Sequence, residues 1–319
     1  MPTPSRPIEL PSRRFGRYRV VSRLGRGGMA EVFLAETERD TGTAAGRRVA
    51  LKMMAKSVDE ESFADEADLM ALLDHPNLVR QLEVGTAFGR HFIAMELLEG
   101  GDLGTRLKSL RARTSTGDPW GLSPSLALHV AVELLRGLAS FHGAKTRSGR
   151  PLGLVHGDVT PANCFFSGRG EVKLGDFGVA KSAALGIGPA EGVTAGKLHY
   201  LSPEQTRHEK LTPRSDLFSL GIVLCELLTG RHPFLPPPGR AEPSEEAVMA
   251  LLRSGRPDLP ASLSPELAAV LRRALAADPD ERFQTAGEFA GALIQRALDE
   301  GLQATSDEIA SLAVPLPRP

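Results

Sequence analysis

The chain has 319 residues, of which 38 are basic and 39 acidic, and 41% are hydrophobic, so its formal net charge is −1. This composition is typical of a folded protein, the length suits a two-lobed enzyme or two small domains, and the balanced charge gives no field that would attract nucleic acid. The two cysteines, Cys164 and Cys225, have neither metal-ligand spacing nor a disulfide framework, so we expect a cytoplasmic protein. The balanced charge predicts no nucleic-acid partner.

Residues 1–14 predict a flexible tail, because basic residues and prolines occur there without the apolar core of a signal peptide. The most apolar stretch is LFSLGIVLCELL at 217–228. It is too short to span a bilayer and carries Glu226, so we expect a buried helix and no membrane segment.

Residues 15–98 predict a small β-sheet with one helix. Strand patterns occur in RYRVVSRL, AEVFLAET, RRVALKMM, VRQLEVGTAF and HFIAMELL. The segment ESFADEADLMALL has a helical period instead, with Phe63, Ala67 and Met70 on one stripe.

From about residue 102 the pattern is mainly helical, and LEGGDL at 98–103 predicts a hinge. We expect helices at 123–142, 214–229, 244–253, 265–276 and 285–300, with loops at 111–121 and 143–153. A last short helix in SDEIASLAV would have Ser306 or Asp307 as its cap. The predicted organisation is a tail (1–14), two lobes (15–98 and 99–300) and a C-terminal extension (301–319).

Gly25, Gly27 and Gly28 predict a phosphate-binding turn in LGRGGMAEV, because backbone amides can approach phosphates closely only where side chains are absent. Ala30 stands at the place of the third glycine in the usual pattern. Many glycine turns bind nothing, so this signal needs the support of other motifs.

Lys52 lies in an apolar strand pattern, VALKMM, where a lysine costs free energy unless its charge is used. It is either an edge lysine that reaches solvent or a cation for nucleotide phosphates, held by an acid of the next helix. We choose Glu66 as that acid, because Asp65 and Asp68 lie off the apolar stripe.

The segment HGDVTPANCFF at 156–166, followed by GDFG at 175–178, carries the most specific chemical signal. It supplies Asp158, then Asn163, then Asp176 in front of Phe-Gly. Protein kinases arrange their catalytic base and two magnesium ligands in this order.

The chain resembles the bacterial eukaryotic-type (Hanks-type) serine/threonine protein kinases over about residues 15–295. The motifs follow the family's order: LGRGGMAEVFLA, VALKMM, HPNLV, MELLEGGDL, HGDVTPAN, DFG, YLSPEQ, SDLFSLG and DERF. The resemblance implies an α+β, two-lobed kinase fold with a small β-rich N-lobe and a larger helical C-lobe. It also implies ATP with Mg²⁺ or Mn²⁺ as cofactors and proteins as substrates, and it leaves open whether the chain forms a homodimer.

The resemblance also implies roles for single residues. Asp158 would orient the acceptor hydroxyl and take its proton, while Asn163 and Asp176 would hold magnesium. The implied adenine and ribose contacts are Leu24, Val32, Ala50, Met95, Glu96, Leu98, Asp102 and Phe165. The implied structural features are a Glu204–Arg282 pair, a catalytic-loop cap by Asp216, and a packed column of Phe177, His156, Met70 and Leu82.

Gly157 departs from the family pattern, which has an arginine before the catalytic aspartate. In the family that arginine binds a phosphorylated activation loop. We therefore hypothesise activity without phosphorylation between DFG and SPE, although Ser182 and Thr194 are available acceptors.

Thr160 stands where these kinases usually have a lysine, and Lys197 stands where they usually have a threonine. Because the two positions face each other in the family fold, we predict that Lys197 reaches Asp158 and the γ-phosphate, with Thr160 as its hydrogen-bond partner. The alternative is that Lys197 is a solvated loop lysine.

Two other functions stay open. HGD with a downstream asparagine also resembles aminoglycoside and choline phosphotransferases, but the glycine-rich hairpin, DFG, SPEQ and SDLFSLG argue against them. A pseudokinase scaffold is the second alternative, because the catalytic-loop lysine is missing. Against it, the base, both metal ligands and the phosphate-binding lysine with its acid are all present.

Overall fold

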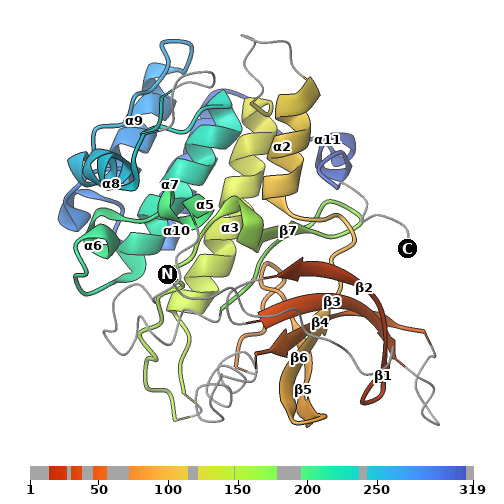
Figure 1. Cartoon of the computed structure of the whole chain (residues 1–319). Helices are drawn as coiled ribbons and strands as arrows, with labels where there is room; N and C mark the ends of the chain where they lie inside the picture. The colour runs from red at the N-terminus through yellow and green to blue at the C-terminus, as the bar shows by residue number, and fades with distance from the viewer. Residues whose placement is uncertain are drawn as a thin grey trace. The chain divides into compact units, whose positions relative to one another are not determined.

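The computed structural model describes residues 14–26, 30–37, 46–55, 72–113, 121–146, 148–177, 195–236 and 243–313. These residues form two compact units. The first takes in the described residues up to Asp74 together with Val79–Glu99, and the second takes in His75–Leu78 and the described residues from Gly100 to Ala313. The first unit is β-rich and the second is mainly helical (Figure 1).

The first unit is a six-stranded antiparallel sheet in the order β1-β2-β3-β4-β6-β5. Its strands are β1 Arg14–Phe15, β2 Tyr18–Arg26, β3 Ala30–Thr37, β4 Arg48–Met54, β5 Gln81–Ala87 and β6 Arg90–Glu96. The five strands expected from the sequence are confirmed, and β3 has the predicted bounds. The helix expected in ESFADEADLMALL lies, up to residue 71, outside the described residues.

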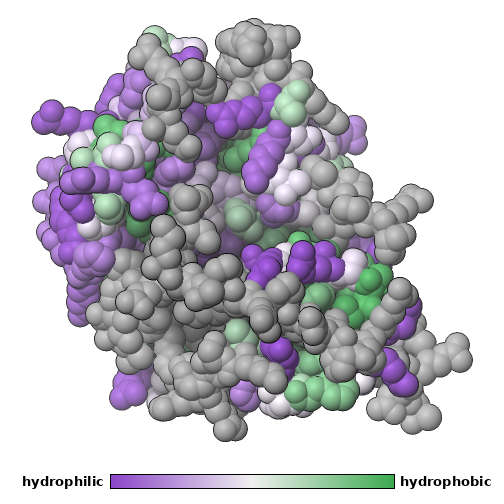
Figure 2. Space-filling model, viewed as in Figure 1, coloured by the Kyte–Doolittle hydropathy of each residue, from purple (hydrophilic) through white to green (hydrophobic). Residues whose placement is uncertain are grey.

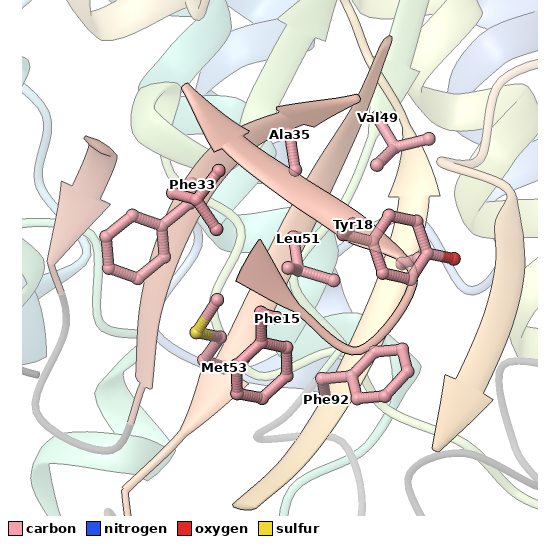
Figure 3. Packing of buried hydrophobic residues seen from close by; sticks show 10 residues of the cluster. Phe15, Tyr18, Phe33, Ala35, Val49, Leu51, Met53 and Phe92 are labelled. Atoms are coloured by element: carbon pink, nitrogen blue, oxygen red, sulfur yellow. The ribbon is translucent and has the colours of Figure 1, made fainter. Parts of the chain in front are cut away.

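One face of this sheet carries a hydrophobic cluster (Figure 3). Its buried members are Phe15, Tyr18, Val20, Phe33, Ala35, Val49, Leu51, Met53, Phe92 and Ala94. Each large apolar side chain buried in this way stabilises the fold by about 1.5–3 kcal/mol. Because side chains alternate between the faces of a strand, Val32, Ala50, Lys52 and Met95 share the opposite face. In the register Val32 pairs with Lys52 and Ala50 pairs with Met95.

The second unit contains most of the helices. They are α2 Leu103–Arg113, α3 Pro124–His142, α5 Ala195–Leu198, α6 Pro203–Thr206, α7 Pro213–Thr229, α8 Glu245–Ser254, α9 Pro265–Ala274, α10 Ala286–Asp299 and α11 Ser306–Ala310. A two-stranded sheet of β7 Cys164–Phe166 and β8 Val172–Leu174 and the 3-10 turns Pro161–Asn163 and Pro279–Glu281 complete the unit. The helices predicted between 123 and 300 are therefore confirmed to within two residues at each end.

The apolar stretch at 217–228 forms part of α7, and its side chains explain the pattern. Leu217, Leu220 and Leu224 share one side of the helix and Ile222 lies on the opposite side, and all four are 0% exposed. The helix ends at Gly230, whose φ of 67° lies in the left-handed region that glycine adopts without strain. A helix buried on nearly all sides gives a fixed platform for the segments that contact it.

The cap of α11 differs from the prediction. Thr305, rather than Ser306 or Asp307, caps this helix, since its Oγ1 accepts from the N–H of Glu308 and the Glu308 carboxylate accepts from the N–H of Thr305. The reciprocal pair requires a spacing of three residues, which only Thr305 has with Glu308.

The outer surface over α8 and α9 is mainly hydrophilic (Figure 2). Large exposed hydrophobic side chains among the described residues are Leu24, Leu72, Phe88, Leu251, Ile294 and Leu298. In the part of the chain that the structure describes, every helix falls short of the length or hydropathy that a membrane-spanning helix needs.

Candidate active site

The buried carboxylate of Asp216 on α7 holds the segment that begins at His156. Its Oδ2 accepts from the backbone N–H of His156 and its Oδ1 from that of Gly157, both at 2.8 Å. The Nε2 of His142, at the end of α3, lies 2.7 Å from Oδ2. These contacts replace the water that a buried carboxylate loses. The predicted cap is confirmed, and His142 is a partner that the sequence did not indicate.

An aromatic cluster holds the DFG segment. The ring of Phe177 packs against His156 at 5.4 Å between centroids, as predicted, and stacks on Phe141 of α3 at 5.3 Å. Phe141 was not expected in this cluster. Of the other predicted members of the column, Met70 lies outside the described residues, and Leu82 packs against the hydrophobic cluster of the first unit.

Asp158 is 7% exposed, and among the described residues its carboxylate has two partners. The Nδ2 of Asn163 donates to Asp158 Oδ2 at 2.8 Å and to the Asp158 carbonyl oxygen at 2.8 Å. The Nζ of Lys197, on α5, lies 2.5 Å from the same Oδ2. The side chain of Lys197 is 38% exposed, so its ammonium contacts the buried carboxylate while part of the side chain stays in solvent.

Thr160 does not form the expected hydrogen bond with Lys197. Its Oγ1 is buried and has no hydrogen-bond partner among the described residues. The ammonium of Lys197 contacts the carboxylate of Asp158, as predicted, in a charge-assisted hydrogen bond. The predicted bond between Thr160 and Lys197 is wrong, and a buried hydroxyl with unused hydrogen-bonding capacity remains in the loop.

Asn163 and Asp176, the predicted metal ligands, are brought together through the backbone. The N–H of Gly175 donates to the Asn163 carbonyl at 2.9 Å, and Asp176 is the next residue. Asp176 has a φ of 63°, which is uncommon for a residue with a side chain and often marks a functional site. Since Asp158 uses the amide nitrogen of Asn163, the amide oxygen is the end that can bind a cation.

An amide oxygen and a carboxylate are ligands that suit Mg²⁺. The described residues contain no group of three or more His, Cys, Asp or Glu side chains that could hold a metal by themselves. A magnesium ion at Asn163 and Asp176 therefore needs additional oxygen ligands, such as those of nucleotide phosphates and water.

The predicted nucleotide contacts of the first unit are partly described. Val32, Ala50, Lys52 and Met95 share one sheet face, as the register shows. In the same unit Leu24 is 37% exposed, Leu98 is 9% exposed, Gly25 pairs with Val32, and Glu96 Oε1 accepts from the N–H of Arg80. Gly27, Gly28 and Glu66 lie outside the described residues, so the Lys52–Glu66 pair stays a prediction.

In the second unit, Asp102 and Phe165 form an isolated β-bridge. The carboxylate of Asp102 accepts from the N–H of Thr105 at 2.8 Å and from its Oγ1 at 2.7 Å. Asp102 therefore has a structural role at the start of α2, and a contact with ribose stays a prediction.

The predicted pair of Glu204 and Arg282 is confirmed and is fully buried. Arg282 is 0% exposed and donates to both carboxylate oxygens of Glu204, at 2.8 and 2.9 Å. Ser215 Oγ donates to Glu204 at 2.7 Å, and three backbone carbonyls accept from the guanidinium of Arg282. Burial alone would raise the pKa of Glu204, but the hydrogen bonds and the charge of Arg282 hold it below its usual value.

Comparison of the sequence with known proteins finds its relatives among the protein kinases. Residues 18–292 match the family model of the protein kinase domain. The tyrosine-protein kinase MasK of Myxococcus xanthus is 37% identical over 292 residues, which cover 88% of this chain and 43% of that protein. A probable serine/threonine-protein kinase of Streptomyces coelicolor is 35% identical over 299 residues, which cover 88% of this chain and 40% of that protein.

The solved structures give the same answer for the fold. The crystal structure of the PknI kinase domain of Mycobacterium tuberculosis matches with a TM-score of 0.58 and 26% identity, covering 89% of this chain and 97% of that one. The chain thus has the two-lobed kinase fold predicted from its sequence. It spans 40% to 43% of the length of the two relatives named above.

Proposed function

Because this chain belongs to the protein kinase family, we propose that it transfers the γ-phosphoryl group of ATP to hydroxyl groups of proteins, with serine and threonine as acceptors. The observation that carries the proposal is the buried carboxylate of Asp158, whose Oδ2 contacts both the side-chain amide of Asn163 and the ammonium of Lys197. A base, a metal ligand and a cation in contact are the parts that phosphoryl transfer requires.

In the proposed reaction Asp158 accepts a hydrogen bond from the acceptor hydroxyl and takes its proton. The hydroxyl oxygen forms a bond to the γ-phosphorus, while the bond from that phosphorus to the bridging oxygen of ADP breaks. Asn163 and Asp176 would hold magnesium, which would supply positive charge to neutralise the phosphates. Val32, Ala50, Lys52 and Met95 supply one sheet face for adenine and phosphate binding, and the shared register supports this assignment.

Lys197 supplies the cation that other family members carry in the catalytic loop. Its contact with Asp158 supports this role, since the position of the charge, rather than its place in the sequence, stabilises the transferring phosphoryl group. Thr160 contributes a buried hydroxyl to the same loop instead of a hydrogen bond to Lys197.

The proposal includes activity without phosphorylation of the activation loop, because Gly157 offers no side chain to bind a loop phosphate. The candidate acceptors Ser182 and Thr194 lie outside the described residues. Treatment of the protein with a phosphatase should leave its activity unchanged. If phosphatase treatment and a Ser182→Ala/Thr194→Ala variant both abolish transfer, this part of the proposal is wrong.

The main experiment measures transfer from radiolabelled ATP with Mg²⁺ to basic proteins and to small amino alcohols, for the wild type and Asp158→Ala. We expect label in protein, absent in the variant, with phosphoserine and phosphothreonine after hydrolysis. No transfer by the wild type would favour the scaffold, and label in amino alcohols alone would favour a small-molecule phosphotransferase. Phosphotyrosine would instead indicate tyrosine as the acceptor, as in the name of the tyrosine-protein kinase MasK of Myxococcus xanthus.

A further inference from the structure

Gln205 on α6 uses the two ends of its side-chain amide for different partners. Its Oε1 accepts from the backbone N–H of Ser202 at 2.9 Å. The backbone N–H of Gln205 in turn donates to Ser202 Oγ at 3.4 Å, and this reciprocal pair caps the helix. Its Nε2 donates to the carbonyl oxygen of Gly157 at 2.8 Å. Gln205 is 5% exposed, so this last bond is sheltered from water and links α6 directly to the catalytic loop.

The backbone of Gly157 is thereby held through both its N–H and its carbonyl group. Its N–H donates to Asp216 Oδ1, and its carbonyl accepts from Gln205 Nε2, each at 2.8 Å. Gly157 has a φ of 73°, which a residue with a side chain adopts only at a cost of about 1–3 kcal/mol. The next residue is Asp158, so these two hydrogen bonds fix the backbone from which the Asp158 side chain projects and thereby the orientation of its carboxylate.

We infer that Gln205 is a positioning residue that holds the catalytic loop through the Gly157 carbonyl and needs no loop phosphate to do so. The inference rests on the proposed function, phosphoryl transfer at Asp158. The other contacts of Asp158, with Asn163 and Lys197, depend on the same orientation of the loop. A small displacement of a reacting group is enough to lower strongly the rate at which a bound substrate reacts.

The substitution Gln205→Glu separates the two tasks of the side chain. A glutamate keeps an acceptor for the Ser202 N–H, as in the usual Ser-x-x-Glu capping box, but when ionised it has no donor for the Gly157 carbonyl. At pH 8 we expect kcat to fall by about tenfold, with the KM for ATP changed less than about twofold.

The pH profile distinguishes positioning from a purely structural role. Burial raises the pKa of a glutamate at this position, and a protonated carboxyl can again donate to the Gly157 carbonyl. The ratio of variant to wild-type kcat should therefore rise as the pH falls from 8 to about 6. The charged groups nearby are Glu204 with Arg282 and Asp216; in the variant the two carboxylates favour the protonated form of the new glutamate, and Arg282 favours the ionised form.

Two further variants complete the test. Gln205→Met removes both ends of the amide, so its kcat should be low at every pH. Ser202→Ala removes only the hydroxyl half of the cap, so it should lower Tm by a few degrees and leave kcat within about twofold of the wild type.

Wild-type kcat for Gln205→Glu at pH 8 would overturn the inference. The inference would also be overturned if Gln205→Glu and Gln205→Met lost the same kcat at all pH values and lowered Tm by as much as Ser202→Ala does. Gln205 would then be a helix cap only. A wild type that transfers no phosphate would instead overturn the proposed function, and this inference with it.

Discussion

The pair of Arg282 and Glu204 and the pair of Lys197 and Asp158 belong to the same helical unit, yet their surroundings differ. Within the described residues, the hydrogen bonds of the buried Arg282 all end on the Glu204 carboxylate or on a backbone carbonyl. Lys197 is 38% exposed, with Asp158 as its partner, and the nearby hydroxyl of Thr160 has no partner in the described part of the chain. A polar cluster with all its hydrogen bonds made serves stability, whereas unused capacity remains for a ligand.

The largest effect on stability should come from breaking the complete pair. Arg282→Met leaves the Glu204 carboxylate buried without its cation, so the free energy of unfolding should fall by about 3–5 kcal/mol. Urea denaturation followed by circular dichroism measures this. The double variant Arg282→Met/Glu204→Leu is the control and should regain most of the loss, because no buried charge is left. A loss below about 1 kcal/mol in the single variant would contradict the contrast.

Asp216 is a second buried carboxylate with all its partners in the protein. Asp216→Ala leaves the N–H groups of His156 and Gly157 buried without an acceptor, which should lower the free energy of unfolding by about 3 kcal/mol. The same denaturation experiment measures it. Asp280→Ala, at a carboxylate that is 82% exposed, is the matched control and should change stability by less than about 0.5 kcal/mol.

His232 extends the comparison to pH. Its Nε2 lies 2.9 Å from the His199 carbonyl oxygen and its Nδ1 accepts from the N–H of Phe234, so both nitrogens are used by the neutral ring. Burial lowers the pKa of His232 from 6.5 to about 3. Its contribution to stability is therefore complete above pH 6.5 and is lost as the pH falls toward 3.

We expect His232 to account for about 3 kcal/mol of the stability lost between pH 7 and pH 4. Unfolding free energies of the wild type and His232→Gln at these two pH values measure it, and the variant should lose less than the wild type does. Equal losses in both proteins would show that His232 does not stay neutral.

The smallest stability effect should come from the partly exposed pair of Lys197 and Asp158. Lys197→Met removes a half-exposed cation, so the free energy of unfolding should change by less than about 1 kcal/mol. Thermal and urea unfolding of this variant beside Arg282→Met test the contrast within one protein. A loss as large as that of Arg282→Met would mean that Lys197 has a structural role.

The sequence predicted the features that depend on local pattern or on the family's spacing. The strand Ala30–Thr37 follows from alternation, α7 from its apolar run, and the contact between Lys197 and Asp158 from the exchanged residue types. The Glu204–Arg282 pair followed from the family motifs, although the two residues are far apart in the sequence.

Features that depend on how segments pack against one another were not predicted. The Oγ1 of Thr160 has no hydrogen-bond partner among the described residues although Lys197 contacts Asp158, and no sequence periodicity predicts this difference. The spacing of Ser202 and Gln205 indicates a capping box, but the bond from Gln205 to Gly157 depends on how α6 packs beside the catalytic loop. Phe141 likewise joins the DFG cluster only through the placement of α3.

The central claim, that Lys197 supplies the missing cation of the catalytic loop, is tested most directly by restoring the family order of the two residues. The measurement is kcat for Lys197→Thr and for Lys197→Thr/Thr160→Lys, with the exposed Lys210→Thr as control. We expect kcat to fall by about 100-fold in the single variant, to recover at least about tenfold in the exchanged variant, and to stay unchanged in the control. A single variant with wild-type kcat, or an exchanged variant no better than the single one, would contradict the account.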